Sequence, residues 1–163
     1  MRASMGRARS CVLALLATLS PALAAAQAAE DLQGAWRVAE MLLPGGGRIA
    51  SPQPGLLLFA GRHYSYTLVN GEQPRPDLPE GVVPAAVLLA VWQPFSANAG
   101  TFEISGDTMT RRPIVAKDPN AMAPGAFNEY TFRIQGDTLW TTPTRTESGP
   151  ARNPPTTRYV RVR

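Results

Sequence analysis

Arg111 is the residue in this sequence whose setting points most directly to binding chemistry. A hairpin is expected around Gly106-Asp107, where glycine supplies the positive φ that a tight turn needs. Pairing outward from this turn sets Arg111 opposite Phe102, and residues that lie opposite each other share one face of a sheet. Because Ile104 and Met109 fall on that same face, we expect Arg111 to point toward an apolar interior.

A guanidinium in that position needs a partner, since an unpaired buried charge is costly. Its planar fork can hold a carboxylate through two parallel hydrogen bonds. Arg111 is therefore a candidate partner for the carboxylate of a ligand. Two alternatives stay open: the side chain reaches water at the mouth of the fold, or a β-bulge flips the register and turns Arg111 outward.

Glu40 is a candidate internal partner for Arg111. One predicted strand places four residues on a shared face at the period of two that strands follow: Trp36, Val38, Glu40 and Leu42. If Trp36 points inward, Glu40 does too, and a Glu40–Arg111 ion pair would satisfy both charges without a ligand. A position of either side chain on the outer wall would exclude this pair.

Other candidate ligand contacts are Tyr64, Tyr66 and Trp92, because aromatic side chains offer a large apolar area and, in tyrosine and tryptophan, one polar group. His63 is the only histidine, so a metal site would need carboxylates alone, and no acidic residues show the spacing of metal ligands. A Gly-x-Ser-x-Gly motif is also missing. We expect no metal, no cofactor and no catalytic residue, with His63 at a turn or rim.

The elements that would position these residues are short strands separated by proline and glycine. Strands are expected at 36–43, 55–60 and 63–69, in hairpins around 106–107 and 136–137, and at 156–163. In the second hairpin Arg133 should face Trp140 on the outer surface. The apolar segment 84–93 is the one predicted helix. It is too short to span a membrane, and its apolar character predicts that it is buried or lies across an apolar surface.

The N-terminal residues 1–28 have the composition of a secretory signal peptide. Three arginines precede an apolar stretch, and small residues offer cleavage sites after Ala26 or Ala28. Three of the 16 basic residues and none of the 12 acidic ones lie in this segment, so 29–163 carries 13 basic and 12 acidic residues. This balance gives no support to nucleic-acid binding. The only cysteine, Cys11, also lies in the leader, which excludes disulfides from the mature domain.

The sequence resembles the bacterial and fungal lipocalin-like domain family, which belongs to the wider group of calycin barrels. The matching segments follow one another along the mature chain: Leu32-Gln33-Gly34-Ala35-Trp36-Arg37, Gly55-Leu56-Leu57-Leu58-Phe59, Tyr64, Arg75-Pro76, 95–103, Pro119-Asn120, Gly125, Gly136-Asp137-Thr138-Leu139 and Tyr159-Val160-Arg161. The resemblance implies that Trp36, next to Gly34, closes one end of a barrel and that Arg161 from the last strand packs over it. One departure is Thr110-Arg111-Arg112-Pro113, where family members often carry histidines, so no role of those histidines is transferred.

Together these observations predict a periplasmic or secreted domain, 29–163, with an all-β fold. We expect a lipocalin-like antiparallel β-barrel of about 8–9 strands with one short helix, and no integral membrane segment once the leader is removed. The resemblance implies a small hydrophobic or amphipathic ligand in the barrel interior, and we expect a binding protein rather than an enzyme. Two alternatives remain: an isomerase or cyclase that polarises a substrate with Arg111, Glu40 or the tyrosines, and a structural barrel filled by its own side chains.

Overall fold

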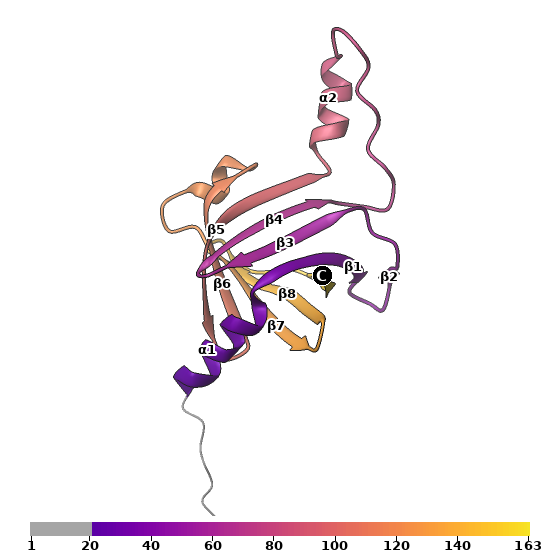
Figure 1. The fold of residues 1–163 in the computed structure, drawn as a ribbon. Helices are drawn as coiled ribbons and strands as arrows, with labels where there is room; N and C mark the ends of the chain where they lie inside the picture. The colour runs from indigo at the N-terminus through magenta and orange to yellow at the C-terminus, as the bar shows by residue number, and fades with distance from the viewer. Residues whose placement is uncertain (1–20) are drawn as a thin grey trace, which may run out of the picture.

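A computed structural model describes residues 21–163 of the protein, and these form a closed antiparallel β-barrel (Figure 1). Within this range the elements are α1 (Pro21–Leu32), β1 (Gly34–Leu42), β2 (Arg48–Ile49), β3 (Gly55–Ala60), β4 (His63–Val69), α2 (Ala85–Trp92), β5 (Phe95–Ser105), β6 (Thr108–Ala116), a 3-10 helix (Pro119–Met122), β7 (Asn128–Gln135), β8 (Thr138–Thr146), β9 (Gly149–Pro150) and β10 (Thr156–Arg161).

The barrel closes through its last strand. Successive wall strands pair in the order β1, β3, β4, β5, β6, β7 and β8, and β10 pairs with both β8 and β1. The wall therefore has eight strands in the described part of the chain, while the short β2 and β9 lie outside it as additions to β1 and β8. The predicted all-β barrel is confirmed, with one more helix than expected because α1 precedes the first strand.

Three hairpins share one kind of two-residue turn, which fixes their registers. Gly61, Gly106 and Gly136 occupy the first turn position with φ of 58°, 61° and 56°, values that a side chain at Cβ would disfavour. The pairing predicted around Gly106-Asp107 is confirmed at each of its four pairs: Ser105 with Thr108, Ile104 with Met109, Glu103 with Thr110 and Phe102 with Arg111. The predicted Arg133–Trp140 pair is confirmed as well, with the guanidinium 3.8 Å from the indole centroid.

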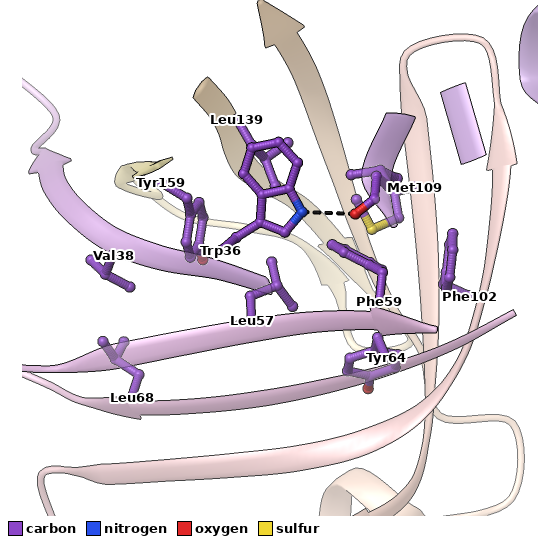
Figure 2. Close-up of a cluster of buried hydrophobic side chains, with 11 residues drawn as sticks. Trp36, Val38, Leu57, Phe59, Tyr64, Leu68, Phe102, Met109, Leu139 and Tyr159 are labelled. Carbon is purple, nitrogen blue, oxygen red and sulfur yellow. Dashed lines mark hydrogen bonds between the residues drawn. The ribbon is translucent and has the colours of Figure 1, made fainter. Parts of the chain in front are cut away.

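Trp36 closes one end of the barrel, as predicted. Its side chain is fully buried, and the indole Nε1 donates a hydrogen bond to the Leu32 carbonyl oxygen at 2.7 Å (Figure 2). The Arg161 guanidinium lies 4.1 Å from the Trp36 ring and donates to the carbonyl oxygens of Gln33 and Asp31, each at 2.6 Å. Arg161 thus joins the last strand to the segment between α1 and β1. The predicted packing of Arg161 over Trp36 is confirmed.

The hydrophobic core consists of the inward-facing side chains of the wall strands, together with Leu32 from α1. Ten of these side chains surround the interior in Figure 2: Trp36, Val38, Leu57, Phe59, Tyr64, Leu68, Phe102, Met109, Leu139 and Tyr159. They come from every wall strand except β7, whose Phe132 and Ile134 pack against the cluster. The rings of Phe59 and Phe102 meet edge to face with centroids 4.9 Å apart. Inward-facing residues therefore fill the part of the barrel next to Trp36.

The predicted helix is present as α2, but the expectation that it packs against an apolar surface is wrong. The helix projects away from the barrel (Figure 1), and none of its side chains, all within the described range, is buried. Leu89 and Trp92 are 53% and 55% exposed. The helix is held at its C-terminal end, where the Lys117 ammonium donates hydrogen bonds to the carbonyl oxygens of Trp92 and Phe95. Lysine at this position satisfies carbonyls that have no intrahelical partner.

The predicted leader lies mostly outside the described residues. Residues 1–20 are not described, and residues 21–28, including the expected cleavage sites, form the first part of α1. No helix among residues 21–163 combines the length and the apolar composition needed to cross a membrane.

Candidate functional site

Arg111 points into the barrel. Its side chain is 2% exposed, and its partner across the hairpin, Phe102, belongs to the core. The guanidinium carbon lies 4.4 Å from the ring centroid of Tyr130, 5.3 Å from that of Tyr64 and 5.6 Å from that of Phe59. The predicted inward orientation of Arg111 is confirmed. A bulge does occur in this hairpin, but it falls between Ala99 and Gly100, beyond Arg111 as counted from the turn.

The Arg111 guanidinium has no anionic partner among the described residues. Its Nε donates only to the Met109 Sδ atom at 3.2 Å, and sulfur is a weak acceptor. In the described part of the chain, two buried side-chain polar atoms lack a hydrogen-bond partner, and these are Arg111 Nη2 and Tyr64 Oη. Aromatic faces offset part of the cost of burying the cation, but they accept no strong hydrogen bond. The interior therefore holds a charged donor that is left unsatisfied.

A cavity of about 150 Å³ lies beside Arg111. The polar residues of its wall are Arg111, Tyr66, Asn70, Tyr130, Thr141, Thr157 and Tyr159. Its apolar part includes Met41, Leu68, Pro143 and Pro155. Asn70, directly after β4, and Pro155, directly before β10, also line it. The cavity thus lies toward the end of the barrel opposite Trp36, and it leaves the interior incompletely packed.

Tyr64, Tyr66 and Tyr159 are neutral hydrogen-bonding groups at physiological pH. Burial raises the pKa of Tyr64, of Tyr66 and of Tyr159, because a phenolate would lose its hydration inside the barrel. The charge of Arg111 acts in the opposite direction on all three and does not cancel the effect of burial. The phenols of Tyr66 and Tyr159 both line the cavity. They can donate to a ligand oxygen there as well as accept.

The predicted contact between Glu40 and Arg111 is wrong, and a bulge in β1 is the reason. Val38 pairs with Tyr159 while Glu40 pairs with Arg158, so Ala39 has no partner in β10. This extra residue reverses the alternation of the strand. Glu40 consequently faces outward, where it accepts a hydrogen bond from Arg158 Nε at 2.7 Å and lies 3.1 Å from Arg48 Nη1. Met41 lines the cavity in its place.

The other sequence-derived candidates divide into two groups. Tyr64 and Tyr66 lie inside the barrel, where Tyr64 stacks on Arg111 and Tyr66 lines the cavity. Trp92 lies on the exposed α2 and does not line the cavity beside Arg111. His63 is exposed beside the Gly61-Arg62 turn, which agrees with the predicted turn or rim position. Among the described residues, no group of three or more acidic, histidine or cysteine side chains could hold a metal ion.

Only Arg111 and Tyr66 of the cavity wall were predicted as ligand contacts, and the missed residues include Tyr130, Thr141, Thr157 and Tyr159. A signal for Thr141 was present, because counting outward from the Gly136-Asp137 turn sets it opposite the apolar Phe132. Thr157 and Tyr159 alternate with Arg158 in β10 and share its inner face. Tyr130 is harder to foresee, since a register shift separates it from Glu129 in the pairing with β8.

Comparisons with known proteins give two solved structures of similar shape. A lipocalin-like protein from Bacteroides uniformis aligns with 81% of this chain and 99% of its own, at 9% sequence identity and a TM-score of 0.47. An uncharacterised protein from Bacteroides eggerthii aligns with 80% of this chain and 99% of its own, at 7% identity and the same TM-score. No family model matches the sequence, and no curated protein is similar to it. The assignment of a closed, eight-stranded antiparallel barrel within residues 21–163 rests on the chain's own strand pairing, in which β10 pairs with both β8 and β1.

Proposed function

We propose that the protein binds a small amphipathic molecule inside the barrel. The observation that carries this proposal is the cavity of about 150 Å³ bordered by the buried Arg111. A cavity of about this volume in the core of another protein accommodates benzene, so the space suits one compact molecule. Polar groups on one part of the wall and apolar groups on another fit a ligand with both characters.

The location of the cavity also supports ligand binding. Trp36, Arg161 and α1 close the opposite end of the barrel. The cavity instead lies toward the strand ends at Asn70 and Pro155, where chain segments connect the wall strands. Segments of this kind are more mobile than the wall. A ligand can reach the interior from this end without disturbing the closed end.

Native mass spectrometry of the gently purified protein tests the proposal most directly. We expect a small molecule bound at one copy per chain, or uptake of benzene-sized probes by protein that is purified empty. The Thr141→Leu variant, which places a larger side chain at the cavity wall, should abolish the bound mass. Thr142→Leu is the matched control, because Thr142 faces the outer surface beside Trp140. No bound molecule and no probe uptake in the folded wild type would refute the proposal.

A further inference from the structure

We infer that the ligand carries a carboxylate, which Arg111 receives at the inner end of the cavity. The inference rests on the proposed binding function and specifies the chemical class of the ligand. It is based on the positive charge of Arg111 inside the barrel, which is unpaired within residues 21–163, and on the size and lining of the cavity beside this residue.

The barrel wall leaves Arg111 without a counter-ion. The described strands contain three acidic residues, and each lies on the outer side of the barrel near an arginine. These residues are Glu40, Glu103 and Glu129. The contacts are Glu40 with Arg158 at 2.7 Å, Glu103 with Arg62 at 3.8 Å and Glu129 with Arg145 at 3.4 Å. Arg111 has no such contact with any described acidic residue. An anion that enters the cavity would supply the missing charge.

The donor atoms of the site favour an oxyanion such as a carboxylate over a neutral or cationic ligand group. A guanidinium has only donors and remains charged in proteins, and Arg111 Nη2 is buried without an acceptor in the described structure. Carboxylate oxygens match the planar fork of arginine. The neutral phenol of Tyr66 lines the same cavity and can donate to the same group. An ammonium group in this position would face a like charge and is rejected.

The remaining volume limits the rest of the ligand. Leu68, Met41, Pro143 and Pro155 form apolar parts of the wall. A cavity of about 150 Å³ leaves room for one ring or a short chain beyond the carboxylate. Benzoate has the right size and combines both characters. We therefore expect compact monocarboxylates to bind, and long-chain fatty acids to be excluded by the small volume of the cavity.

Calorimetric titration with three probes that share one benzene ring tests the inference: benzoate, its neutral isostere benzamide, and toluene. We expect wild-type protein to bind benzoate at least about tenfold more tightly than benzamide or toluene. Arg111→Met should weaken benzoate binding by at least about tenfold and leave toluene binding unchanged or stronger. Arg111→Lys keeps the positive charge but lacks the planar pair of N–H donors. Its affinity for benzoate should therefore lie between those of the wild type and Arg111→Met.

Arg112→Met provides the matched control, because Arg112 is the next residue along β6 and faces outward. It should bind benzoate as the wild type does. Equal affinities for benzoate and the two neutral probes would overturn the carboxylate inference and leave the proposed function intact. Unchanged benzoate binding in folded Arg111→Met would also overturn it. If none of the three probes binds and native mass spectrometry finds the protein empty, the proposed function fails as well.

Discussion

Phe102 and Arg111 lie opposite each other across the β5–β6 hairpin, so a phenylalanine ring and a guanidinium share the inner face of the barrel. The hairpin turn at Gly106-Asp107 imposes this relationship through its register. The rings of Tyr130, Tyr64 and Phe59 then surround the cation. Arg111 thus occupies a position where an aliphatic side chain would suit the apolar core better.

Replacement of Arg111 by methionine should leave the barrel as stable as the wild type or make it more stable. Methionine fills similar space without a buried charge, and comparable replacements of buried charged groups are neutral or stabilising by up to about 4 kcal/mol. Urea unfolding followed by circular dichroism measures the difference. A loss of more than about 1 kcal/mol would instead show that the contacts with the aromatic rings hold the barrel together.

Arg161→Ala should destabilise the protein by about 2–4 kcal/mol. The substitution removes the stacking on Trp36 and leaves the carbonyl oxygens of Gln33 and Asp31 without their donor. Thermal and urea unfolding check this value. Arg163→Ala is the control two residues away, because Arg163 is 84% exposed and pairs only with Asp137 at the surface. It should change stability by less than about 0.5 kcal/mol.

Gly100→Ala should destabilise the barrel strongly, by about 3 kcal/mol or more. A Cβ atom at this position would lie 1.9 Å from the Arg112 carbonyl oxygen and 2.8 Å from the Pro113 Cα atom. Both are backbone atoms, so the β5–β6 pairing must shift to make room. Gly47→Ala is the control, since its nearest neighbour would be the Leu43 side chain at 3.4 Å. Equal stability of the two variants would contradict the close approach of Gly100 to the β6 backbone next to the unpaired Ile114.

The contribution of Glu40 to stability should depend on pH. A hydrogen bond from Arg158 is the main factor that lowers the Glu40 pKa, with the charges of Arg158 and Arg48 adding to it. A lowered pKa in the folded state stabilises the protein at any pH above the ordinary glutamate value of about 4.3. That stabilisation is lost as the pH falls through the lowered pKa. Glu40→Gln should therefore be less stable than the wild type at pH 7, and the difference should disappear in acid.

Glu103→Gln is the matched control for this pH dependence, because it makes the same change in charge at an outer strand position. The Glu103 carboxylate lies 3.8 Å from Arg62, and both side chains are mostly exposed. Exposed pairs of this kind contribute little. Parallel stability curves for Glu40→Gln and the wild type between pH 3 and pH 7 would show that the Arg158 contact does not favour the ionised carboxylate.

Local turn chemistry explains why the sequence predicts the inner face around Arg111 correctly. A two-residue turn that begins with glycine determines every pair of the hairpin until the bulge at Gly100. Glu40 shows the opposite case, because no residue near Ala39 signals a bulge. One unpaired residue was enough to move the carboxylate from the interior to the outer wall.

The exposed position of α2 could not be predicted from its own residues either. The apolar composition of residues 85–92 favours a helix that packs against a partner, and this rule assumes that an apolar surface lies within reach. Here the inward-facing side chains of the wall strands pack against one another without α2. Lys117 holds the C-terminal end of the helix at the rim of the barrel. The orientation of α2 therefore depends on tertiary contacts far away in the sequence. The cavity was also beyond prediction, because its size depends on how Tyr66, Thr141 and Tyr159 pack against one another.

The pairing of β1 with β10 has a consequence for how the chain folds. Trp36 and Arg161 meet across the two strands that lie farthest apart in the sequence of the wall. The entropic cost of bringing distant segments together slows such pairings. Until β10 arrives, the facing edges of β1 and β8 are open and can pair with other chains. We therefore expect barrel closure to be the slow step of folding, and the nearly closed intermediate to be the species that aggregates.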